Sequence, residues 1–285
     1  MIVAVLGTGI MGAPMAANLI GAGFDVRVWN RTESKTAPLV ELGAAKAATP
    51  GDAARGAEIV ISMLTDGPTV RAVMTGRDGA LAAMSADALW VQMSTVGVSH
   101  TERLAALATE AGVSFVDAPV LGTKQPAQQG ALVVLAAGDD TALDRCQLVF
   151  DAVGSRTIRA GDLGAASKLK LVANNWVLAV TNGTAESIAL AKRLGVDPQQ
   201  FLESISGGAL DLPYAHLKGG AMISGDYPLS FPLSLAAKDA RLVLDAAGDP
   251  ELAGTRGALT NLERAERAGH GGEDMAALFY GIEVR

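Results

Sequence analysis

A lysine and an asparagine four residues apart, Lys170 and Asn174, are the side chains of this sequence best placed for chemistry. Both fall in the stretch 164–194, which lacks proline and is rich in Ala, Leu, Lys and Glu, so one long helix is predicted there. Residues four apart on a helix share a face. A lysine ammonium beside an amide can give a proton to an oxygen that the amide orients. The alternative is a lysine stem that covers apolar surface and an asparagine bonded to nearby backbone.

The sequence also predicts where this helix ends and how much of it is buried. Gly195 is the expected C-cap, and Asp197-Pro198 is a typical start for the next helix. The first half is apolar on almost every side, which predicts burial between two bodies of protein. Its apolar residues are Leu169, Leu171, Val172, Trp176, Val177, Leu178 and Val180.

A glycine-rich turn follows the short apolar run 2–6 and precedes a predicted helix and a second strand, 25–29. This order of strand, glycine turn, helix and strand is the context of the dinucleotide-binding fingerprint. The glycines let the backbone turn tightly and approach a pyrophosphate, whose charge the N–H groups of the helix start face. A turn without a ligand is the alternative. The predicted contacts are Gly7, Gly9, Ile10, Met11 and Gly12.

The end of the second strand predicts the type of dinucleotide. An acidic residue usually stands there to bind the ribose hydroxyls of NAD. This chain has Asn30, Arg31 and Thr32, with Lys35 shortly after. Cationic and hydroxyl groups suit a 2′-phosphate, so NADP(H) is predicted in preference to NAD(H), although Arg31 and Lys35 are also ordinary surface residues.

Further strands alternate with helices up to about residue 162, which predicts a doubly wound parallel sheet of the Rossmann type. Ligands of such sheets lie beyond the carboxyl ends of the strands. Met63-Leu64, Ser94-Thr95 and 118–120 are expected along that edge, with Met63, Leu64 and Thr95 as cofactor contacts and Ser94 and Thr95 as substrate contacts. The turn-rich loop after Val120 contains Gly122-Thr123-Lys124, whose N–H, hydroxyl and ammonium groups suit a small carboxylate or simply a solvated loop.

The chain beyond the sheet reads as helices only, with expected spans 197–206, 212–224, 234–247, 251–269 and 273–284. We therefore predict a Rossmann domain, 1–162, and an all-helical substrate and dimerisation domain, 163–285, joined by the interdomain helix 164–194. A helical domain of this size often pairs with a second copy, so a homo-oligomer, dimer or tetramer, is expected.

The amino-acid composition argues against several other classes of protein. The 285 residues carry a formal net charge of −7 and form no basic stripe, which argues against a nucleic-acid partner. The single cysteine, Cys146, cannot form an internal disulfide. The N-terminal segment lacks a basic region and makes a poor signal peptide, no apolar run reaches membrane-spanning length, and no Cys/His spacing suggests a metal. A cytoplasmic protein is expected.

Four stretches together resemble the β-hydroxyacid dehydrogenase family over essentially the whole chain. GTGIMGAPMAANL resembles the family's cofactor signature and DAPVLGTKQPAQQG its substrate signature. GAASKLKLVANN resembles its catalytic signature and FPLSLAAKDARL a second cofactor contact. The second and fourth are most similar to the glyoxylate/succinic semialdehyde reductase branch.

The resemblance implies roles for individual residues. Lys170, not Lys168, would be the catalytic lysine, and Asn174 would orient the substrate. Thr95 would lie near the nicotinamide and the substrate, while Gly122 and Thr123 would bind the acid group. From the helical domain, Phe231 and Lys238 would close over the cofactor, with Asp239 beside the substrate.

One position departs from the family pattern, because Leu121 stands where the substrate signature has serine. Losing a hydrogen bond to a charged group costs about 1.5–3 kcal/mol, or one to two decades of affinity. The expected activity is NADPH-dependent hydride transfer to a small aldehyde or oxo acid, such as glyoxylate or succinic semialdehyde, and Leu121 favours less polar carbonyls. The rival readings are an imine reductase and a non-catalytic NADP-binding module.

Overall fold

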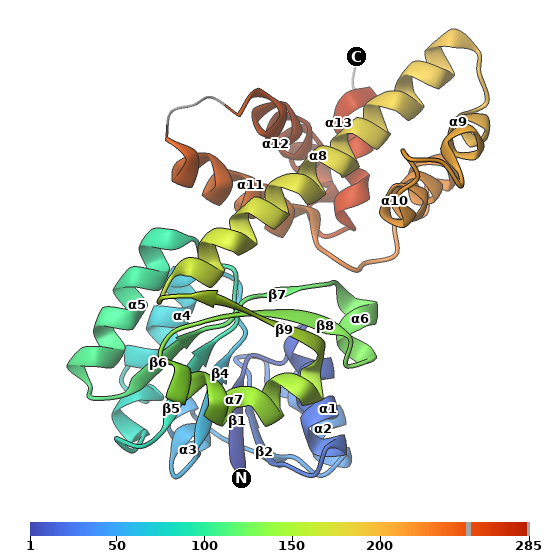
Figure 1. The fold of residues 1–285 in the computed structure, drawn as a ribbon. Coiled ribbons are helices and arrows are strands. Elements are labelled where there is room, and N and C mark those ends of the chain that lie inside the picture. Colours follow the sequence, from blue (N-terminus) through green and yellow to red (C-terminus); the bar gives the residue numbers. More distant parts are fainter. Residues whose placement is uncertain (249–251, 284–285) are drawn as a thin grey trace. The chain divides into compact units, whose positions relative to one another are not determined.

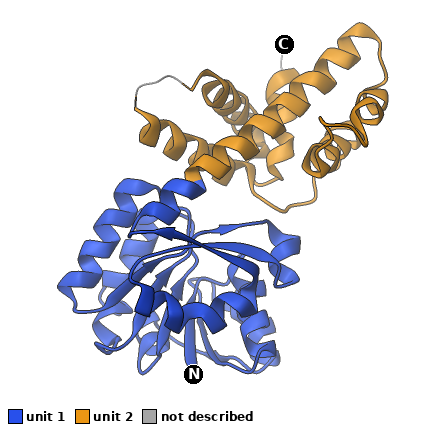
Figure 2. Cartoon of the chain, in the orientation of Figure 1, with its two compact units in different colours: residues 1–170 blue, residues 171–285 orange. Residues whose placement is uncertain are grey.

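The computed structural model describes residues 1–248 and 252–283 and forms two compact units, 1–170 and 171–285 (Figure 2). The division falls within the long helix α8 (Ala165–Leu194), after Lys170. Residue 251, the predicted start of one helix, and residue 284, the predicted end of another, lie outside the described residues.

A nine-stranded sheet with helices on both faces forms the first unit (Figure 1). The strands are β1 (Ile2–Leu6), β2 (Asp25–Trp29), β3 (Ala45–Lys46), β4 (Ile59–Ser62), β5 (Leu89–Gln92), β6 (Ser114–Asp117), β7 (Val120–Leu121), β8 (Leu132–Ala137) and β9 (Gly154–Gly161). Their order is β3-β2-β1-β4-β5-β6-β8-β7, and β9 pairs with β8. The direction in which successive strands are added to the sheet therefore reverses between β1 and β4. The glycine turn follows β1 at this point, and α/β sheets bind their ligands at such a reversal.

The helices of this unit are α1 (Gly12–Gly21), α2 (Ala37–Glu41), α3 (Pro50–Ala54), α4 (Gly67–Thr75), α5 (Val98–Glu110), α6 (Lys124–Gln128) and α7 (Asp140–Val153), with 3₁₀ turns η1 (Glu33–Thr36) and η2 (Leu81–Ala83). Buried residues of α1, α2 and α7 pack on one face of the sheet, and those of α3, α4 and α5 pack on the other. Alternate strand residues serve the two faces, for example Val3 and Val5 against Ala4 and Leu6. Burial on both faces explains the continuous apolar runs of these strands.

The region after β6 differs from the prediction. The predicted parallel sheet becomes mixed there, because β8 pairs antiparallel with both β6 and β7. The predicted loop contains strand β7 and the short helix α6. Pro126 is the third residue of α6, where its missing N–H has no helical partner to lose, so the proline that suggested a loop is compatible with a helix.

The second unit is helical, as predicted. It contains α8 from Leu171 onward, α9 (Pro198–Ile205), α10 (Pro213–Ser224), α11 (Leu233–Ala247), α12 (Ala253–Ala265), η3 (Glu266–His270), η4 (Met275–Leu278) and α13 (Phe279–Glu283). Asp197 caps α9 by accepting a hydrogen bond from Gln199 N, and Gly195 ends α8 with a positive φ of 72°. Both helix boundaries were predicted from the sequence, and both are confirmed.

The apolar surface of α8 is less buried than predicted. Leu171 and Leu178 are buried, whereas Val172 and Trp176 are 67% and 62% exposed. The helix has a buried face and an exposed apolar face, so the predicted burial of its first half between two bodies of protein is wrong for Val172 and Trp176 in the single chain. A sequence that is apolar all round cannot distinguish a core from a surface that a partner covers.

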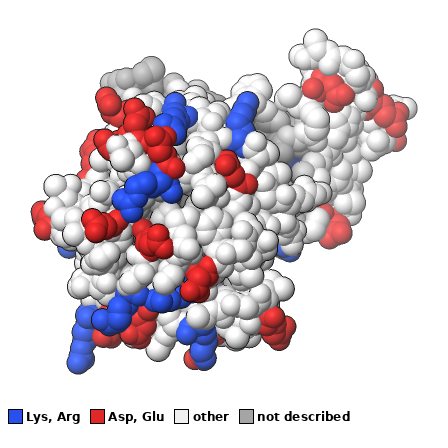
Figure 3. Space-filling model, turned by 60° about the horizontal axis from the view of Figure 1, so that its bottom comes forward, with Lys and Arg blue, Asp and Glu red and all other residues white. Residues whose placement is uncertain are grey.

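Figure 3 shows how the charged side chains are distributed on one face of the molecule. There, among the described residues, basic and acidic side chains are interspersed rather than gathered into separate patches. Within the same described residues, no helix combines the length and the apolar character that crossing a membrane requires.

Candidate active site

The glycine turn between β1 and α1 is shaped by two close backbone approaches. Gly7 has a φ of 103°, and a Cβ on Gly12 would lie 1.9 Å from the Gly7 carbonyl oxygen. Packing of the turn therefore requires glycine at both positions. A Cβ on Gly9, in contrast, would meet nothing within 4 Å. Gly9 leaves an open approach to the start of α1, where Met11 makes no side-chain cap, so this turn fits a bound pyrophosphate.

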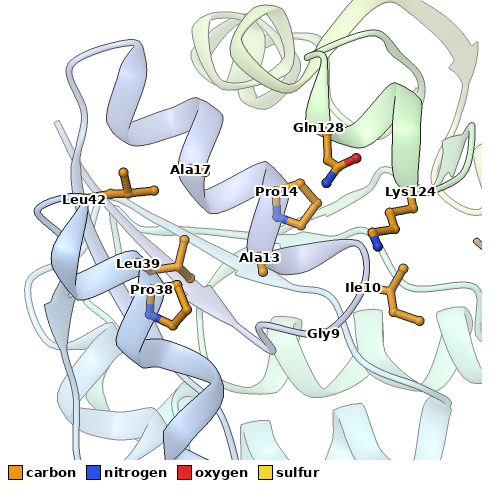
Figure 4. A pocket seen from close by; sticks show the side chains of 10 residues that line it. All are labelled: Gly9, Ile10, Ala13, Pro14, Ala17, Pro38, Leu39, Leu42, Lys124 and Gln128. Atoms are coloured by element: carbon orange, nitrogen blue, oxygen red, sulfur yellow. The ribbon is translucent and has the colours of Figure 1, made fainter. Parts of the chain in front are cut away.

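A hollow of about 380 Å³ adjoins this turn, between α1, α2 and α6 (Figure 4). Its walls come from the starts of α1 and α2 and from α6, and most of its lining is apolar. It is lined by Gly9, Ile10, Ala13, Pro14, Ala17, Pro38, Leu39, Leu42, Lys124 and Gln128. Gly9 and Ile10 of the expected cofactor turn line the hollow, whereas Lys170 and Asn174 do not, so the hollow is separate from the predicted reaction site.

The end of β2 is tied to the glycine turn by Asn30. The Asn30 Oδ1 accepts a hydrogen bond from Thr8 N at 3.1 Å, and its Nδ2 donates to Thr32 O at 2.9 Å. The side chains of Arg31, Thr32 and Lys35 are exposed beside it. Asn30 thus shapes the backbone that presents three exposed cationic or hydroxyl groups.

A buried polar network joins the ends of β4 and β5. Ser94 Oγ accepts from Leu64 N at 2.8 Å and donates to Ser62 O at 3.2 Å. Gln92 closes the turn, because its side chain accepts from Ser94 N and donates to Ser94 O. Ser94 is 1% exposed and holds both turns together, whereas Met63, Leu64 and Thr95 are partly exposed along this edge. The predicted role of Ser94 at the substrate would require it to act through these turns.

The predicted substrate loop starts with a leucine that packs inward. Leu121 pairs with Val133 and lies against a small apolar cluster that includes Leu135 and Ala166. Gly122 follows with a φ of 121°, and a Cβ there would come within 2.7 Å of the Leu132 side chain. Thr123 stands at the N-cap position of α6 without using its hydroxyl as a cap. The fold therefore requires Gly122, and it leaves the Thr123 hydroxyl to other partners.

The first turn of α8 is fastened by a residue that the sequence analysis missed. Asp117, at the end of β6, accepts hydrogen bonds from Ser167 N at 2.8 Å and lies 2.7 Å from Ser167 Oγ. Burial raises the pKa of the Asp117 carboxyl, although its hydrogen bonds with Ser167 oppose the shift. The only sequence signal is an acid directly after an apolar strand, and its partner lies 50 residues away.

In the second unit, Asn174 is held by an aspartate of α11. Asn174 Nδ2 donates to Asp239 Oδ2 at 2.7 Å, and both residues are 4% exposed. Lys238 Nζ lies 2.8 Å from Asp239 Oδ1 as an ion pair whose geometry is not that of a hydrogen bond. Asp239, which is predicted at the substrate, thus accepts a hydrogen bond from Asn174 and fixes the orientation of its side-chain amide.

Phe231 belongs to a loop that a buried ion pair holds. Asp274 accepts from Phe231 N at 3.1 Å and from Ser230 Oγ at 2.7 Å, and its other oxygen lies 2.6 Å from Lys218 Nζ. Burial alone would raise the pKa of Asp274, but the Lys218 charge and these hydrogen bonds outweigh it and lower the pKa. Lys218 and Asp274 are supporting residues that the sequence did not reveal.

The structure places the predicted residues in two groups, each within one unit. The glycine turn, the β2 end, the β4 and β5 turns, the 120–123 loop and Lys170 belong to the first unit. Asn174, Phe231, Lys238 and Asp239 belong to the second. Lys170 and Asn174 are neighbours through α8 itself, one helical turn apart. Their roles toward cofactor and substrate stay predictions.

Family comparisons agree with this architecture. The model described as the NAD binding domain of 6-phosphogluconate dehydrogenase matches residues 2–161. The model described as "NAD-binding of NADP-dependent 3-hydroxyisobutyrate dehydrogenase" matches residues 164–280. The chain therefore belongs to the β-hydroxyacid dehydrogenase family, and it is an NAD(P)-dependent dehydrogenase or reductase.

Individual relatives narrow the comparison. The chain is 39% identical to glyoxylate/succinic semialdehyde reductase 2, chloroplastic, of Arabidopsis thaliana, covering 85% of this chain and 68% of that protein. It is 33% identical to glyoxylate/succinic semialdehyde reductase 1 of the same plant, covering 98% and 97%. The solved structure of Mycobacterium tuberculosis 3-hydroxyisobutyrate dehydrogenase with L-serine superposes with a TM-score of 0.88 at 28% identity, covering 99% of both chains.

Imine reductases share the fold at a greater distance. The enzyme from Pseudomonas sp. has a TM-score of 0.65 at 23% identity over 99% of both chains. Likeness at this level concerns the fold alone.

Proposed function

We propose that this protein reduces the carbonyl group of a short aldehyde or oxo acid with NADPH, and that Lys170 is the proton donor. The nicotinamide, when bound, supplies the hydride to the carbonyl carbon. Lys170 Nζ gives a proton to the carbonyl oxygen, so the products are the alcohol and NADP⁺, and the neutral amine regains its proton from water. Before it gives up the proton, the Lys170 ammonium also stabilises the negative charge that develops on the carbonyl oxygen.

The observation that carries this proposal is the fixed amide one turn from Lys170. Asn174 is buried and donates to Asp239 at 2.7 Å, so the amide keeps one orientation. A structural asparagine would commonly bond to nearby backbone, whereas this one is tied by a buried carboxylate 65 residues away. An amide held in this way can orient a carbonyl for Lys170.

The cofactor preference rests on the β2 end. Arg31 and Lys35 offer exposed cations and Thr32 offers a hydroxyl, with no acid at position 30 to repel a 2′-phosphate. We expect Arg31→Ala to raise the KM for NADPH by about tenfold to a hundredfold, the value of a lost charge-assisted hydrogen bond. The KM for NADH should change little, and an equal effect on both would contradict the preference.

The substrate class rests on the relatives and on the 120–123 loop. The Arabidopsis proteins are named for glyoxylate and succinic semialdehyde. These two substrates are short carbonyl compounds that carry a carboxylate. Gly122 and Thr123 remain able to bind an acid group, but Leu121 gives no hydroxyl. We expect Leu121→Ser to improve turnover of the acids relative to uncharged aldehydes.

The deciding experiment follows NADPH consumption with short semialdehydes, glyoxylate and cyclic imines. Lys170→Ala should lower kcat by about two to four decades while NADPH affinity stays near wild type, since general acid catalysis contributes that much. Lys168→Ala is the matched control, because Lys168 is exposed two residues earlier, and it should keep full activity. Equal losses of kcat and NADPH affinity in Lys170→Ala would refute the chemical role. Turnover of imines alone would favour an imine reductase, and NADPH binding without turnover would favour a non-catalytic module.

We also propose a cytoplasmic homo-oligomer that pairs through α8 of the helical unit. The exposed apolar residues Val172, Trp176, Leu190 and Leu194 lie along one stripe of the helix, with the exposed Gly183 at its centre. Their spacings of four, seven, seven and four residues are symmetric about Gly183. In an antiparallel pair crossing at Gly183, Trp176 of one copy would face Leu190 of the other, which is the self-complementarity that a two-fold interface needs.

A further inference from the structure

Lys124 belongs to a short helix, α6, that is fixed to α1. The backbone carbonyl of Ala127 in α6 accepts a hydrogen bond from Asn18 Nδ2 of α1 at 2.7 Å. Ala127 is also 0% exposed and belongs to the same apolar cluster as Met15 and Leu19 of α1. The side chains of α6 therefore have a defined position relative to the start of α1 and to the glycine turn that precedes it.

The side chain of Lys124 extends into the hollow that borders this turn. Lys124 and Gln128 are four residues apart on one face of α6, and both point from this helix into the hollow (Figure 4). Gly9 and Ile10 of the glycine turn line the same hollow, and Lys124 extends on the side of Ile10 (Figure 4). Lys124 is the one charged residue among the ten described residues that form this lining. The fold thus brings a cation to the edge of the expected cofactor turn.

The glycine turn itself offers no positive side chain to an anion. Residues 7–12 read GTGIMG and are all uncharged, so the turn can bind phosphate oxygens chiefly through the N–H groups at the start of α1. Each phosphate of a pyrophosphate carries a negative charge, and hydrogen bonds between ionised partners are roughly twice as strong as those between neutral ones. Within residues 1–248 and 252–283, the Lys124 ammonium has no ion pair or hydrogen bond with the protein. Lys124 can therefore supply the charge that the turn lacks.

The sequence also allowed a second partner for Lys124, the acid group of the substrate. Gly122 and Thr123 are the predicted contacts of that acid group, and neither of them lines the hollow. Thr123 stands at the N-cap position of α6, directly before Lys124, whose side chain lies in the hollow beside the cofactor turn. The surface that Lys124 shares is therefore that of the cofactor turn, which favours the phosphates over the acid group.

We propose that Lys124 is a cofactor-binding residue whose ammonium binds the pyrophosphate of NADP(H) or NAD(H) at the glycine turn. The pyrophosphate is common to both dinucleotides, so Lys124 adds affinity for the cofactor without selecting between them. Arg31 and Lys35, in contrast, are proposed to bind the 2′-phosphate that only NADP(H) carries. The proposal does not depend on Lys170 or on the identity of the substrate, because it concerns binding and not the chemical step.

The test measures dissociation constants by calorimetric titration of the whole chain with three ligands. NADPH and NADH both contain the pyrophosphate, whereas adenosine 2′,5′-bisphosphate has the 2′-phosphate but no pyrophosphate. Lys124→Met keeps an apolar stem and removes the charge. It should weaken NADPH and NADH by the same factor, about tenfold to a hundredfold for one charge-assisted hydrogen bond, and leave adenosine 2′,5′-bisphosphate unchanged. Lys124→Arg should retain most of the affinity, since a guanidinium also binds phosphate.

Lys35→Met is the matched control, because it removes an exposed lysine on the opposite side of the turn. It should weaken NADPH and adenosine 2′,5′-bisphosphate but not NADH. Wild-type dissociation constants for NADPH and NADH in Lys124→Met would overturn the proposal, and so would a loss confined to NADPH. An unchanged affinity for both cofactors with a raised KM for glyoxylate would assign Lys124 to the acid group instead. Urea unfolding of Lys124→Met should match the wild type, since Lys124 is exposed, and an equal free energy of unfolding shows that a lost affinity is not a lost fold.

Discussion

Replacing Gly9 with alanine should separate cofactor binding from folding. A Cβ at this position would meet nothing within 4 Å, and the backbone there is not left-handed, so the folded chain accommodates the methyl group. A glycine-to-alanine change at such a site stabilises a protein by about 0.4–1 kcal/mol, because the unfolded chain loses freedom. The methyl group would nevertheless occupy the space through which a pyrophosphate approaches the start of α1.

The expected loss of affinity follows from the contacts that the methyl group blocks. One charge-assisted hydrogen bond is worth about 1.5–3 kcal/mol, so losing one weakens NADPH binding about tenfold to 150-fold. Gly12→Ala is the matched control, because its Cβ would lie 1.9 Å from Gly7 O and the helix would have to move away from the strand. Overpacking of this kind costs about 1–3 kcal/mol of stability.

Two measurements on both variants check the reasoning. Calorimetric titration with NADPH gives the dissociation constant, and urea unfolding gives the free energy of unfolding. Gly9→Ala should be as stable as the wild type or more so, with weakened binding, and Gly12→Ala should be clearly less stable. Wild-type affinity in Gly9→Ala, or instability equal to that of Gly12→Ala, would refute the assignment of Gly9 to the cofactor.

Three further predictions concern the helical unit. Lys218→Met should lower the free energy of unfolding by about 3 kcal/mol in urea, the lower end of the range for a broken buried pair, because Asp274 keeps its backbone and Ser230 donors. Since the pKa of Asp274 is lowered below 3.8 by folding, its contribution is complete above that pH and is lost as the pH falls further, so Asp274→Asn should flatten the acid limb of stability against pH. Trp176→Glu should convert the oligomer to a 29.0 kDa monomer in light scattering, whereas Leu148→Glu, at a residue of α7 that is 67% exposed, should not. A monomeric wild type, or dissociation by both changes, would contradict pairing through α8.

The features that could be predicted from the sequence are local in the chain. The buried strands β1, β4 and β5 are short, mostly apolar runs, and the glycine turn directly follows the first of them. The cap of α9 by Asp197 depends on a hydrogen bond to Gln199, two residues away. Such features need only the conformational preferences of neighbouring residues.

The features that could not be predicted depend on partners far apart in the chain. Asp239 follows Asn174 by 65 residues, and Asp274 follows Lys218 by 56. An aspartate in a sequence does not tell which amide or ammonium the fold will bring to it. Helix α6 was missed for a different reason, since Pro126 and the neighbouring polar residues have the composition of a turn.

The network that joins the ends of β4 and β5 has a consequence for how this protein can vary. The indole N–H of Trp90 donates to Ser62 Oγ at 2.9 Å, and Ser62 in turn lies beside Gln92, whose amide holds Ser94. All four side chains are buried. An apolar residue in place of Ser62, Gln92 or Ser94 therefore leaves an N–H group without its partner, namely the indole of Trp90 or the backbone of Ser94 or Leu64. We therefore expect Ser62, Gln92 and Ser94 to vary together rather than singly, because exchanging this network for an apolar one passes through variants that fold poorly.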